Sequence, residues 1–298
     1  MPLALRSPYH STGFTWLRGN LHAHSTLSDG ALTRADLCAA YRARGYDFLA
    51  LSEHDLQEPL ASAEAPDGLL VLPAVEVSAR GPHVLAVGGS AAIQPDADRQ
   101  RVIDAIVADG AIAILNHPNW LHDYNHFPQA EMERLNGYAG IEIYNGVIEV
   151  LEGSALATDR WDRLLSAGRT VWGYANDDTH RPDDIGRAWN VVQATERSES
   201  AVLDALRAGR CYGSSGVVIE RITVSGRHLG VQAPGADRVR FIGSYGRMLA
   251  IFEGETATYA ADGREGGYVR VECLGAGGRA AWTQPFWVEE EGHANRTP

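Results

Sequence analysis

Two histidines and an aspartate follow the first apolar segment of the chain. Residues 19–30 (GNLHAHSTLSDG) contain His22, His24 and Asp29, and residues 15–21 before and around them have the character of a short strand. Alternate side chains of an extended backbone share a face, so His22 and His24 can point at one ion. Neutral imidazole is a common ligand of zinc, manganese and iron. The pair alone does not establish a metal site, because two histidines at this spacing can also simply flank the end of a strand.

Metal-type side chains also occur next to later apolar runs. These residues are His54, Glu76, His117, Asp178 and His180. In α/β folds, ligands and catalytic groups gather at the carboxyl ends of parallel strands, because the loops there converge on one mouth. His83 is the exception, since it begins a short run, although it lies close to Glu76 in sequence. We therefore expect these side chains to meet at one mouth.

Glu76 is the most informative of these positions when each is judged alone. It lies inside the apolar run 68–77 (GLLVLPAVEV), where burying an unpaired carboxylate would cost several kcal/mol. Either a partner ion is present or this segment is not buried. His54 and His117 could each be a solvated loop histidine, and Asp178-x-His180 repeats the spacing of the first pair.

A loop over residues 119–128 could line a substrate pocket. Its side chains offer stacking surface and hydrogen bonds, and they are Trp120, His122, Tyr124 and His126. A mobile surface loop is the alternative. His10, His228 and His293 stand in segments with no other site signal, so we expect them to be ordinary surface groups.

Composition excludes several classes of function. The net charge of −12 opposes non-specific binding to duplex nucleic acid, although bound cations would still permit an anionic substrate. The chain contains no lysine, which excludes Schiff-base chemistry and a lysine-dependent phosphate loop. Its three cysteines are far apart, so neither a disulfide framework nor a thiolate zinc site is expected. No segment resembles a membrane span or a secretory signal, and we expect a cytoplasmic protein.

The elements that must position these residues alternate between strand and helix up to about residue 216. Predicted strands occupy 15–21, 47–51, 68–77, 83–87, 111–115, 140–144, 170–174 and 189–194. Predicted helices begin after Thr33 and run over 98–108, 158–167 and 198–208. This alternation indicates a parallel sheet, either open or closed into a barrel.

The alternation of predicted strands and helices ends after residues 213–216 (GSSG). From Val217 onward, short alternating runs are divided by glycine-rich turns and no convincing helix is present. We therefore predict two domains, an α/β domain over 1–216 and a small antiparallel, sandwich-like β domain over 217–298. The second domain carries no cluster of His, Asp or Glu, so we expect it to be structural or to form one wall of the pocket.

Taken together, the motifs resemble the polymerase and histidinol phosphatase (PHP) superfamily of metal-dependent hydrolases. The motifs that carry the resemblance are His22-x-His24, Ser28-Asp29-Gly30, Glu53-His54-Asp55, Glu76, Gly81-Pro82-His83, Asn116-His117-Pro118 and Asp178-x-His180. The opening residues 16–25 and the closing residues 281–285 (AWTQP) are similar to the carbaryl-hydrolase branch. The resemblance implies a distorted (β/α)7 barrel with two or three metal ions.

The resemblance also implies how the ligands are shared. His22, His24, Glu76 and Asp178 would hold the first ion, and Glu76, His83 and His117 the second, with Glu76 bridging the two. Asp29, His54 and His180 would hold the third ion, although some members have histidine where this chain has Asp29. The mixed nitrogen and oxygen set suits Mn, Zn and Fe alike.

Hydrolysis is the reaction that such a centre favours. Closely spaced ions lower the pKa of a shared water, so a metal-bound hydroxide can attack without a protein nucleophile. We expect Glu76 and His180 to be catalytic, with Arg181 stabilising the oxygens of the group under attack. Arg18 is a weaker candidate for binding the substrate, as is Arg187.

Three functions remain open at this point. The superfamily favours a phosphoesterase that acts on a small, anionic phosphorylated molecule. The branch makes a hydrolase of carboxylic or carbamic esters a serious competitor. A metal-binding module without catalysis is the third, and the apparently complete ligand set argues against it. The sequence predicts no oligomeric state.

Overall fold

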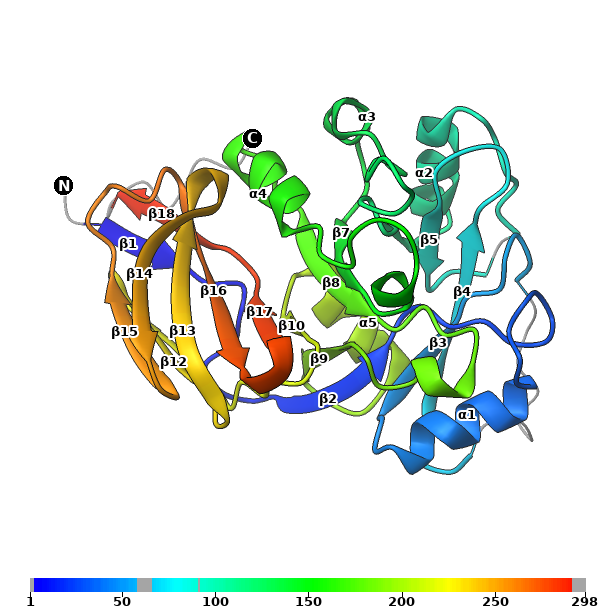
Figure 1. Ribbon diagram of the computed structural model, residues 1–298, viewed down its shortest axis with the longest axis horizontal. Helices are drawn as coiled ribbons and strands as arrows, with labels where there is room; N and C mark the ends of the chain where they lie inside the picture. The colour runs from blue at the N-terminus through cyan, green and yellow to red at the C-terminus, as the bar shows by residue number, and fades with distance from the viewer. Residues whose placement is uncertain (1–2, 58–65, 91, 291–298) are drawn as a thin grey trace.

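The computed structural model describes residues 3–57, 66–90 and 92–290. An α/β part and a β-rich part lie side by side along the long axis of the molecule (Figure 1). His293 lies outside the described residues. None of the helices within them is long and apolar enough to cross a bilayer.

One mixed sheet forms the centre of the α/β part. Its strands are β2 (Thr15–Asn20), β3 (Phe48–Leu51), β4 (Leu70–Val77), β5 (Val84–Val87), β6 (Ile112–Leu115), β7 (Gly140–Asn145), β8 (Trp172–Asn176), β9 (Trp189–Ala194) and β10 (Cys211–Ser214). They lie in the order β10-β9-β2-β3-β4-β5-β6-β7-β8. The strands match the predicted runs closely, and β10 was not predicted.

The sheet is parallel in only two blocks, which corrects the expectation of a parallel sheet throughout. β2, β3 and β4 are parallel, as are β6, β7 and β8, whereas β5 is antiparallel to both β4 and β6. The reason is the short connection over residues 78–83, because a parallel return requires a crossover of a dozen or more residues. This hairpin brings His83, at the start of β5, back beside the carboxyl end of β4.

Five α-helices occur in the described residues. They are α1 (Arg34–Ala43), α2 (Arg99–Ala108), α3 (Gln129–Arg134), α4 (Thr158–Ser166) and α5 (Glu199–Arg207). The predicted start of α1 is confirmed, because Thr33 Oγ1 accepts a hydrogen bond from the Asp36 N–H at 3.2 Å. Just beyond its end, Gly45 has a φ of 78°, which glycine adopts without strain. The short helix α3 was not predicted.

The outer edge of β8 is covered by side-chain amides instead of a neighbouring strand. Asn190 Nδ2 donates to the Ala175 carbonyl at 2.8 Å, and Asn190 Oδ1 accepts from the Ala175 N–H at 3.1 Å. Gln284 forms the same pair of bonds with Gly173, at 2.7 and 2.9 Å. One isolated parallel bridge, between Ala23 and Thr179, joins the ends of β2 and β8. Within the described strands no ladder closes the sheet, so a (β/α)7 barrel stays a prediction.

The β-rich part is a two-layered antiparallel arrangement. Its strands are β1 (Leu3–Arg6), β11 (Arg221–Ser225), β12 (His228–Gln232), β13 (Ala236–Gly243), β14 (Arg247–Glu253), β15 (Thr256–Ala260), β16 (Tyr268–Gly275), β17 (Ala280–Thr283) and β18 (Phe286–Glu290). β11, β12 and β15 form a separate sheet, and the buried rings of Phe241 and Tyr259 stack at 5.2 Å. As expected, no α-helix occurs between Val217 and Glu290.

The two parts share backbone pairing and a buried ion pair. β10 pairs with β17, and β1 from the start of the chain pairs with β18. Asp162 on α4 accepts two hydrogen bonds from the Arg270 guanidinium, both at 2.7 Å, and one from Tyr268 at 2.8 Å. The domain boundary at residues 216–217 stays a prediction, because the sheet continues across it.

Candidate metal centre

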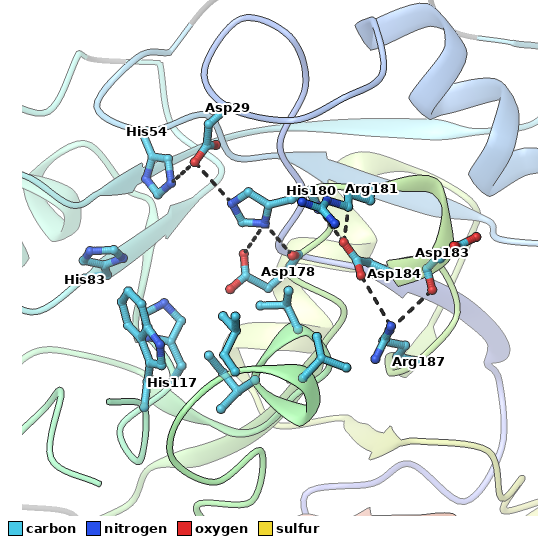
Figure 2. Close-up of a pocket in the computed structure, with 15 residues that line it drawn as sticks. Asp29, His54, His83, His117, Asp178, His180, Arg181, Asp183, Asp184 and Arg187 are labelled. Carbon is cyan, nitrogen blue, oxygen red and sulfur yellow. Dashed lines mark hydrogen bonds and ion pairs between the residues drawn. The ribbon is translucent and has the colours of Figure 1, made fainter. Parts of the chain in front are cut away.

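The nine metal-type side chains converge at one mouth of the sheet. Their ring nitrogens and carboxylate oxygens surround Glu76, and several of them line a pocket of about 640 Å³ (Figure 2). Most of them lie just after the end of a strand: His22 and His24 follow β2, His54 follows β3, His117 follows β6, and Asp178 and His180 follow β8. The structure therefore brings together the residues that the sequence pattern places at strand ends.

Glu76 lies at the centre of the cluster and is 1% exposed. Its Oε1 atom lies 3.0 Å from His83 Nδ1, 3.2 Å from His117 Nε2 and 3.3 Å from His22 Nε2. Its Oε2 atom lies 3.0 Å from His54 Nδ1 and 3.6 Å from His24 Nε2. The two oxygens thus face different sets of histidines, an arrangement that a bridging carboxylate needs.

The first group combines His22, His24 and Asp178. Asp178 Oδ1 lies 3.2 Å from both His22 Nε2 and His24 Nε2. These three atoms are buried, and none has a hydrogen-bond partner in the described structure. Asp178 Oδ2, by contrast, accepts a hydrogen bond from Asn145 at 3.1 Å. The unpartnered atoms point at one another, which leaves a cation as the natural partner for all three.

The second group contains His83 and His117, and the ring of His126 packs against both. The ring centroids of His83 and His117 lie 5.0 Å apart, and the ring of His126 lies 4.7 Å from each. His126 Nε2 accepts a hydrogen bond from the His83 backbone N–H at 3.0 Å. Burial, followed by the nearby His117 and His83, lowers the pKa of His126 to about 2, so this ring is neutral. His126 therefore holds the start of β5 in place.

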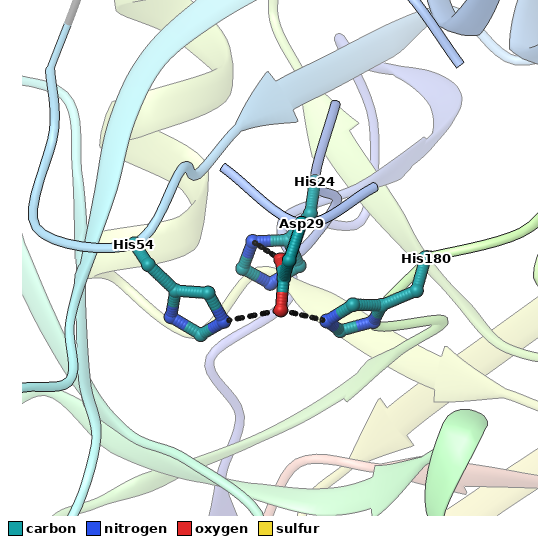
Figure 3. Close-up of side chains that lie close together, drawn as sticks. All are labelled: His24, Asp29, His54 and His180. Carbon is teal, nitrogen blue, oxygen red and sulfur yellow. Dashed lines mark ion pairs between the residues drawn. The ribbon is translucent and has the colours of Figure 1, made fainter. Parts of the chain in front are cut away.

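The third group contains Asp29, His54 and His180, together with His24 (Figure 3). Asp29 Oδ2 lies 3.4 Å from the Nε2 atoms of both His54 and His180. The His24 ring packs against those of both His54 and His180, at centroid distances of 4.4 and 4.5 Å. His24 faces Asp29 with Nδ1 and Asp178 with Nε2, so it borders both the first and the third group.

Glu142 supports the cluster from behind, and the sequence analysis did not single it out. Its carboxylate is buried in β7, where Oε1 accepts a hydrogen bond from His22 Nδ1 at 2.8 Å. Glu142 Oε2 also accepts from the His117 N–H at 2.9 Å. Since Nδ1 of His22 donates to Glu142, Nε2 is the nitrogen left facing the first group. Asn116 is a second supporting residue, and its amide donates to Glu76 Oε1 at 2.7 Å.

Two site residues have unusual backbone conformations. The φ angles of His117 and Asp178 are 28° and 55°, in a region that residues other than glycine seldom adopt. Each lies two residues beyond the end of a strand, β6 or β8, and turns its side chain into the mouth. Such strain persists where surrounding bonds enforce it, and clusters at functional sites.

The substrate-binding candidates are placed unequally. Trp120 and Arg181 line the pocket, whereas His122 and Tyr124 are exposed and outside its lining. Arg18 is not in this pocket either, because its side chain lies between the rings of Tyr46 and Trp189. The substrate-binding roles of these residues stay predictions.

Electrostatics of the cluster favour bound cations. Burial raises the pKa of Glu76, but the nearby His22, His117 and His54 outweigh it, so the net pKa lies well below its usual range. His180 and His54 together hold the pKa of Asp29 well below its usual range. Glu76, Asp29 and Asp178 are therefore ionised at neutral pH. Three carboxylates beside buried imidazole nitrogens that lack partners fit divalent ions with mixed nitrogen and oxygen ligands.

A family model described as PHP-associated matches residues 168–211. This segment runs from just before β8 to the start of β10 and carries Asp178 and His180. The match covers a short part of the chain and does not by itself place the chain in the family. No curated protein sequence matches the chain.

Among solved structures, the chain is similar to a two-domain protein from Bacteroides vulgatus, described as containing a predicted PHP-like metal-dependent phosphoesterase. The TM-score is 0.55 at 18% identity, over 94% of this chain and 97% of that one. The likeness shows a shared mixed α/β fold over both parts of the molecule.

Two further solved structures are less similar, and their similarity is too weak to indicate the fold or function of this chain. The first is PsfC from Pseudomonas syringae, with a TM-score of 0.46 and 13% identity over 66% of this chain and 88% of that one. The second is an amidohydrolase from Chromobacterium violaceum, with a TM-score of 0.42 and 18% identity over 55% of this chain and 88% of that one.

Proposed function

We propose that this chain is a metal-dependent hydrolase of the PHP type and, within that class, a phosphoesterase acting on a small phosphorylated molecule. One observation carries the proposal. Buried nitrogens of His22 and His24 and an oxygen of Asp178 have no hydrogen-bond partner in the described structure, and the oxygen lies 3.2 Å from each nitrogen beside the ionised Glu76. A protein leaves such atoms unpaired at a considerable cost in free energy unless a ligand satisfies them.

The proposed ligand sets follow the three groups of side chains. His22, His24, Glu76 and Asp178 would hold one ion, Glu76, His83 and His117 a second, and Asp29, His54 and His180 a third. Bound Mn, Zn or Fe would supply activation of water and neutralisation of charge on the phosphoryl oxygens. Glu76 would be shared by the first two ions, because its Oε1 lies beside His83 and His117 and its Oε2 lies 3.6 Å from His24 Nε2.

The side chains at the mouth suit an anionic group. Arg181 is exposed on the pocket wall and has no ion pair with a carboxylate among the described residues, so its guanidinium can donate to phosphoryl oxygens. The apolar wall of the pocket contains Trp120, Val147, Ile148, Val150 and Leu151. We propose that this wall holds the organic part of the ester and keeps bulk water away from it.

A panel of three chromogenic esters tests the proposal. The metal-free protein is assayed alone and with Mn, Zn or Fe on p-nitrophenyl phosphate, bis-p-nitrophenyl phosphate and p-nitrophenyl acetate. We expect metal-dependent release of nitrophenol from at least one phosphoester, and its loss in His24→Ala. Turnover of the acetate alone would support the carboxylic ester hydrolase instead, and no turnover by metal-loaded protein would favour a non-catalytic metal module.

A further inference from the structure

A second cavity adjoins the metal pocket on the side of the β-rich part. It has a volume of about 340 Å³ and lies between β2, β9 and the turn from β16 to β17. Its charged lining consists of Arg18, Arg187, Arg279 and Glu149. Arg187, which Figure 2 shows in the lining of the metal pocket, also lines this cavity, so the two are neighbours.

Arg18 is held rigidly but keeps donors to spare. Its guanidinium carbon lies 3.7 Å from the centre of the Trp189 ring and 4.2 Å from that of Tyr46. One terminal nitrogen donates to Tyr46 Oη at 3.2 Å, while Nε is buried and has no hydrogen-bond partner. No carboxylate within the described ranges forms an ion pair with it. A guanidinium stacked on two rings can donate only at its edge, which suits a planar or tetrahedral oxyanion.

The other two arginines differ in their partners. Arg187 Nε donates to the Asp183 carbonyl at 3.3 Å, and its terminal nitrogens lie 3.6 Å from Glu149 Oε2 and Asp184 Oδ1. Arg279 is exposed, and none of the carboxylates that the structure describes forms an ion pair with it. Its side chain runs over Gly216, where a Cβ atom would lie 2.4 Å from Arg279 Cδ. Glycine at this position therefore makes room for the arginine beside the cavity.

The charge of this cavity opposes that of the whole chain. Its lining contains three arginines and one glutamate, whereas the whole chain carries a net charge of −12. Guanidinium groups that line one cavity repel one another and are stabilised by a bound anion. Such a cluster beside a hydrolytic pocket indicates recognition of negative charge.

We propose that this cavity binds an anionic phosphate or carboxylate group, distinct from the ester that is cleaved. The group is either a second anionic group of the substrate or free inorganic phosphate. Only the first alternative rests on the proposed function of the metal pocket.

Binding of inorganic phosphate to the metal-free protein, followed by isothermal titration calorimetry, tests the cavity directly. Arg279 is exposed, so Arg279→Gln should fold normally. We expect it to weaken phosphate binding about tenfold, since one charge-assisted contact is lost. Arg247→Gln, an equally exposed change on β14, is the matched control and should leave the affinity unchanged. Absence of phosphate binding at millimolar concentration, or equal affinity of wild type and Arg279→Gln, would overturn the proposal.

A substrate comparison separates the two sources of the anion. Phenyl phosphate is compared with 4-carboxyphenyl phosphate and its longer biphenyl analogue on the metal-loaded enzyme. If the substrate supplies the anion, one carboxylated ester should have a higher kcat/KM, and both Arg279→Gln and Arg18→Met should abolish the preference. Phosphate binding without such a preference identifies free phosphate as the ligand. Phosphate binding with no hydrolysis of any ester would leave the anion site standing and contradict the phosphoesterase.

Discussion

At the scale of single residues, Glu142 determines which nitrogen of His22 faces the first group. Its Oε1 accepts a hydrogen bond from His22 Nδ1. Three further hydrogen bonds, donated by His117, Asn145 and Asn176, hold the carboxylate in place. Glu142→Gln keeps the shape but loses the charge. We expect it to weaken metal binding about 10- to 100-fold, as changes to such supporting partners of ligand histidines do.

Competition with a coloured chelator measures this loss of affinity. Glu131→Gln, a change on helix α3 away from the site, serves as the control and should match wild type. An unchanged metal affinity in Glu142→Gln would show that Glu142 does not fix the orientation of His22. The far-ultraviolet circular dichroism spectrum establishes that both variants are folded.

The third group makes metal binding dependent on pH. Burial alone would lower the pKa of His54, but its contacts with Asp29 and Glu76 outweigh burial and raise the pKa to about 10. Burial alone would likewise lower the pKa of His180, but its contacts with Asp29 and Asp178 outweigh burial and raise the pKa to about 9. Both imidazoles are therefore protonated at pH 7 without metal, and must lose their protons to bind it.

We therefore expect metal binding at pH 7 to release protons and its affinity to rise as the pH increases from 7 toward 10. Calorimetric titrations in buffers of different ionisation enthalpy count the protons released. Asp29→Asn removes the carboxylate that raises both pKa values, so it should release fewer protons. Proton release equal in wild type and Asp29→Asn would contradict the role given to Asp29.

Glu76 and Glu142 also show what the sequence can and cannot reveal about the site. Each is a glutamate inside an apolar strand, and the first was singled out by that signal. The same signal is present in residues 140–144 (GIEIY), so a glutamate inside an apolar run also marked Glu142. Its partner His22 is 120 positions away in sequence, so the contact depends on the order of strands in the sheet.

At the scale of elements, one edge of β8 pairs with β7, whereas side-chain amides bond to backbone groups on its other edge. Asn190 satisfies both the N–H and the carbonyl of Ala175, and Nδ2 also donates to Asn176 at 2.9 Å. Asn190→Ala would leave these buried backbone groups unpaired. We expect a loss of about 2–4 kcal/mol in the free energy of unfolding, since each unsatisfied group costs roughly 1–3 kcal/mol.

Urea unfolding followed by circular dichroism measures the loss at Asn190. Gln232→Ala, on the exposed face of β12, is the control and should change stability little. A destabilisation of Asn190→Ala no larger than the control would mean that the edge of β8 does not need the amide.

The direction of β5 illustrates why the elements were easier to predict than their pairing. Apolar runs and glycine breaks marked the positions of β4, β5 and β6 to within a few residues. Strand direction depends on the connection, and the short turn over residues 78–83 forces an antiparallel return. The bonds of Asn190 and Gln284 to β8 have no local signal at all, because each joins distant parts of the chain.

At the scale of the whole molecule, a buried ion pair links the α/β part to the β-rich part. The Asp162 carboxylate and the Arg270 guanidinium form two parallel hydrogen bonds, and both side chains are buried. Asp162→Ala would leave Arg270 without its main partner. We expect it to cost about 3–5 kcal/mol, because the buried guanidinium would keep only its hydrogen bond to Glu272 Oε1 at 2.7 Å among the described residues, and breaking a buried ion pair is strongly destabilising.

The double variant Asp162→Ala with Arg270→Met isolates the charge effect. It removes both charges, so it should be more stable than Asp162→Ala alone. Denaturant unfolding measures both, with Asp159→Ala on the same helix as the exposed control. Equal stability of the single and double variants would contradict the charge argument.

The small β-rich part was anticipated as antiparallel, but its connection to the rest of the chain was not. β1 lies near the amino terminus and yet pairs with β18, and β17 continues the ladder of β10 and β9. Composition and glycine spacing indicate local strands, whereas such pairings join segments about 70 residues apart, or more than 280 for β1. Only the folded structure reveals them.

The central claim is that two ions share Glu76, and the metal content of Glu76→Gln tests it most directly. Wild type and variant are loaded with Mn or Zn, freed of excess metal and measured by elemental analysis, with folding checked by circular dichroism. Because the two oxygens of Glu76 face different histidines, the variant should lose about two ions per chain and nearly all activity. A folded Glu76→Gln protein that keeps the full metal complement of wild type would contradict the shared centre.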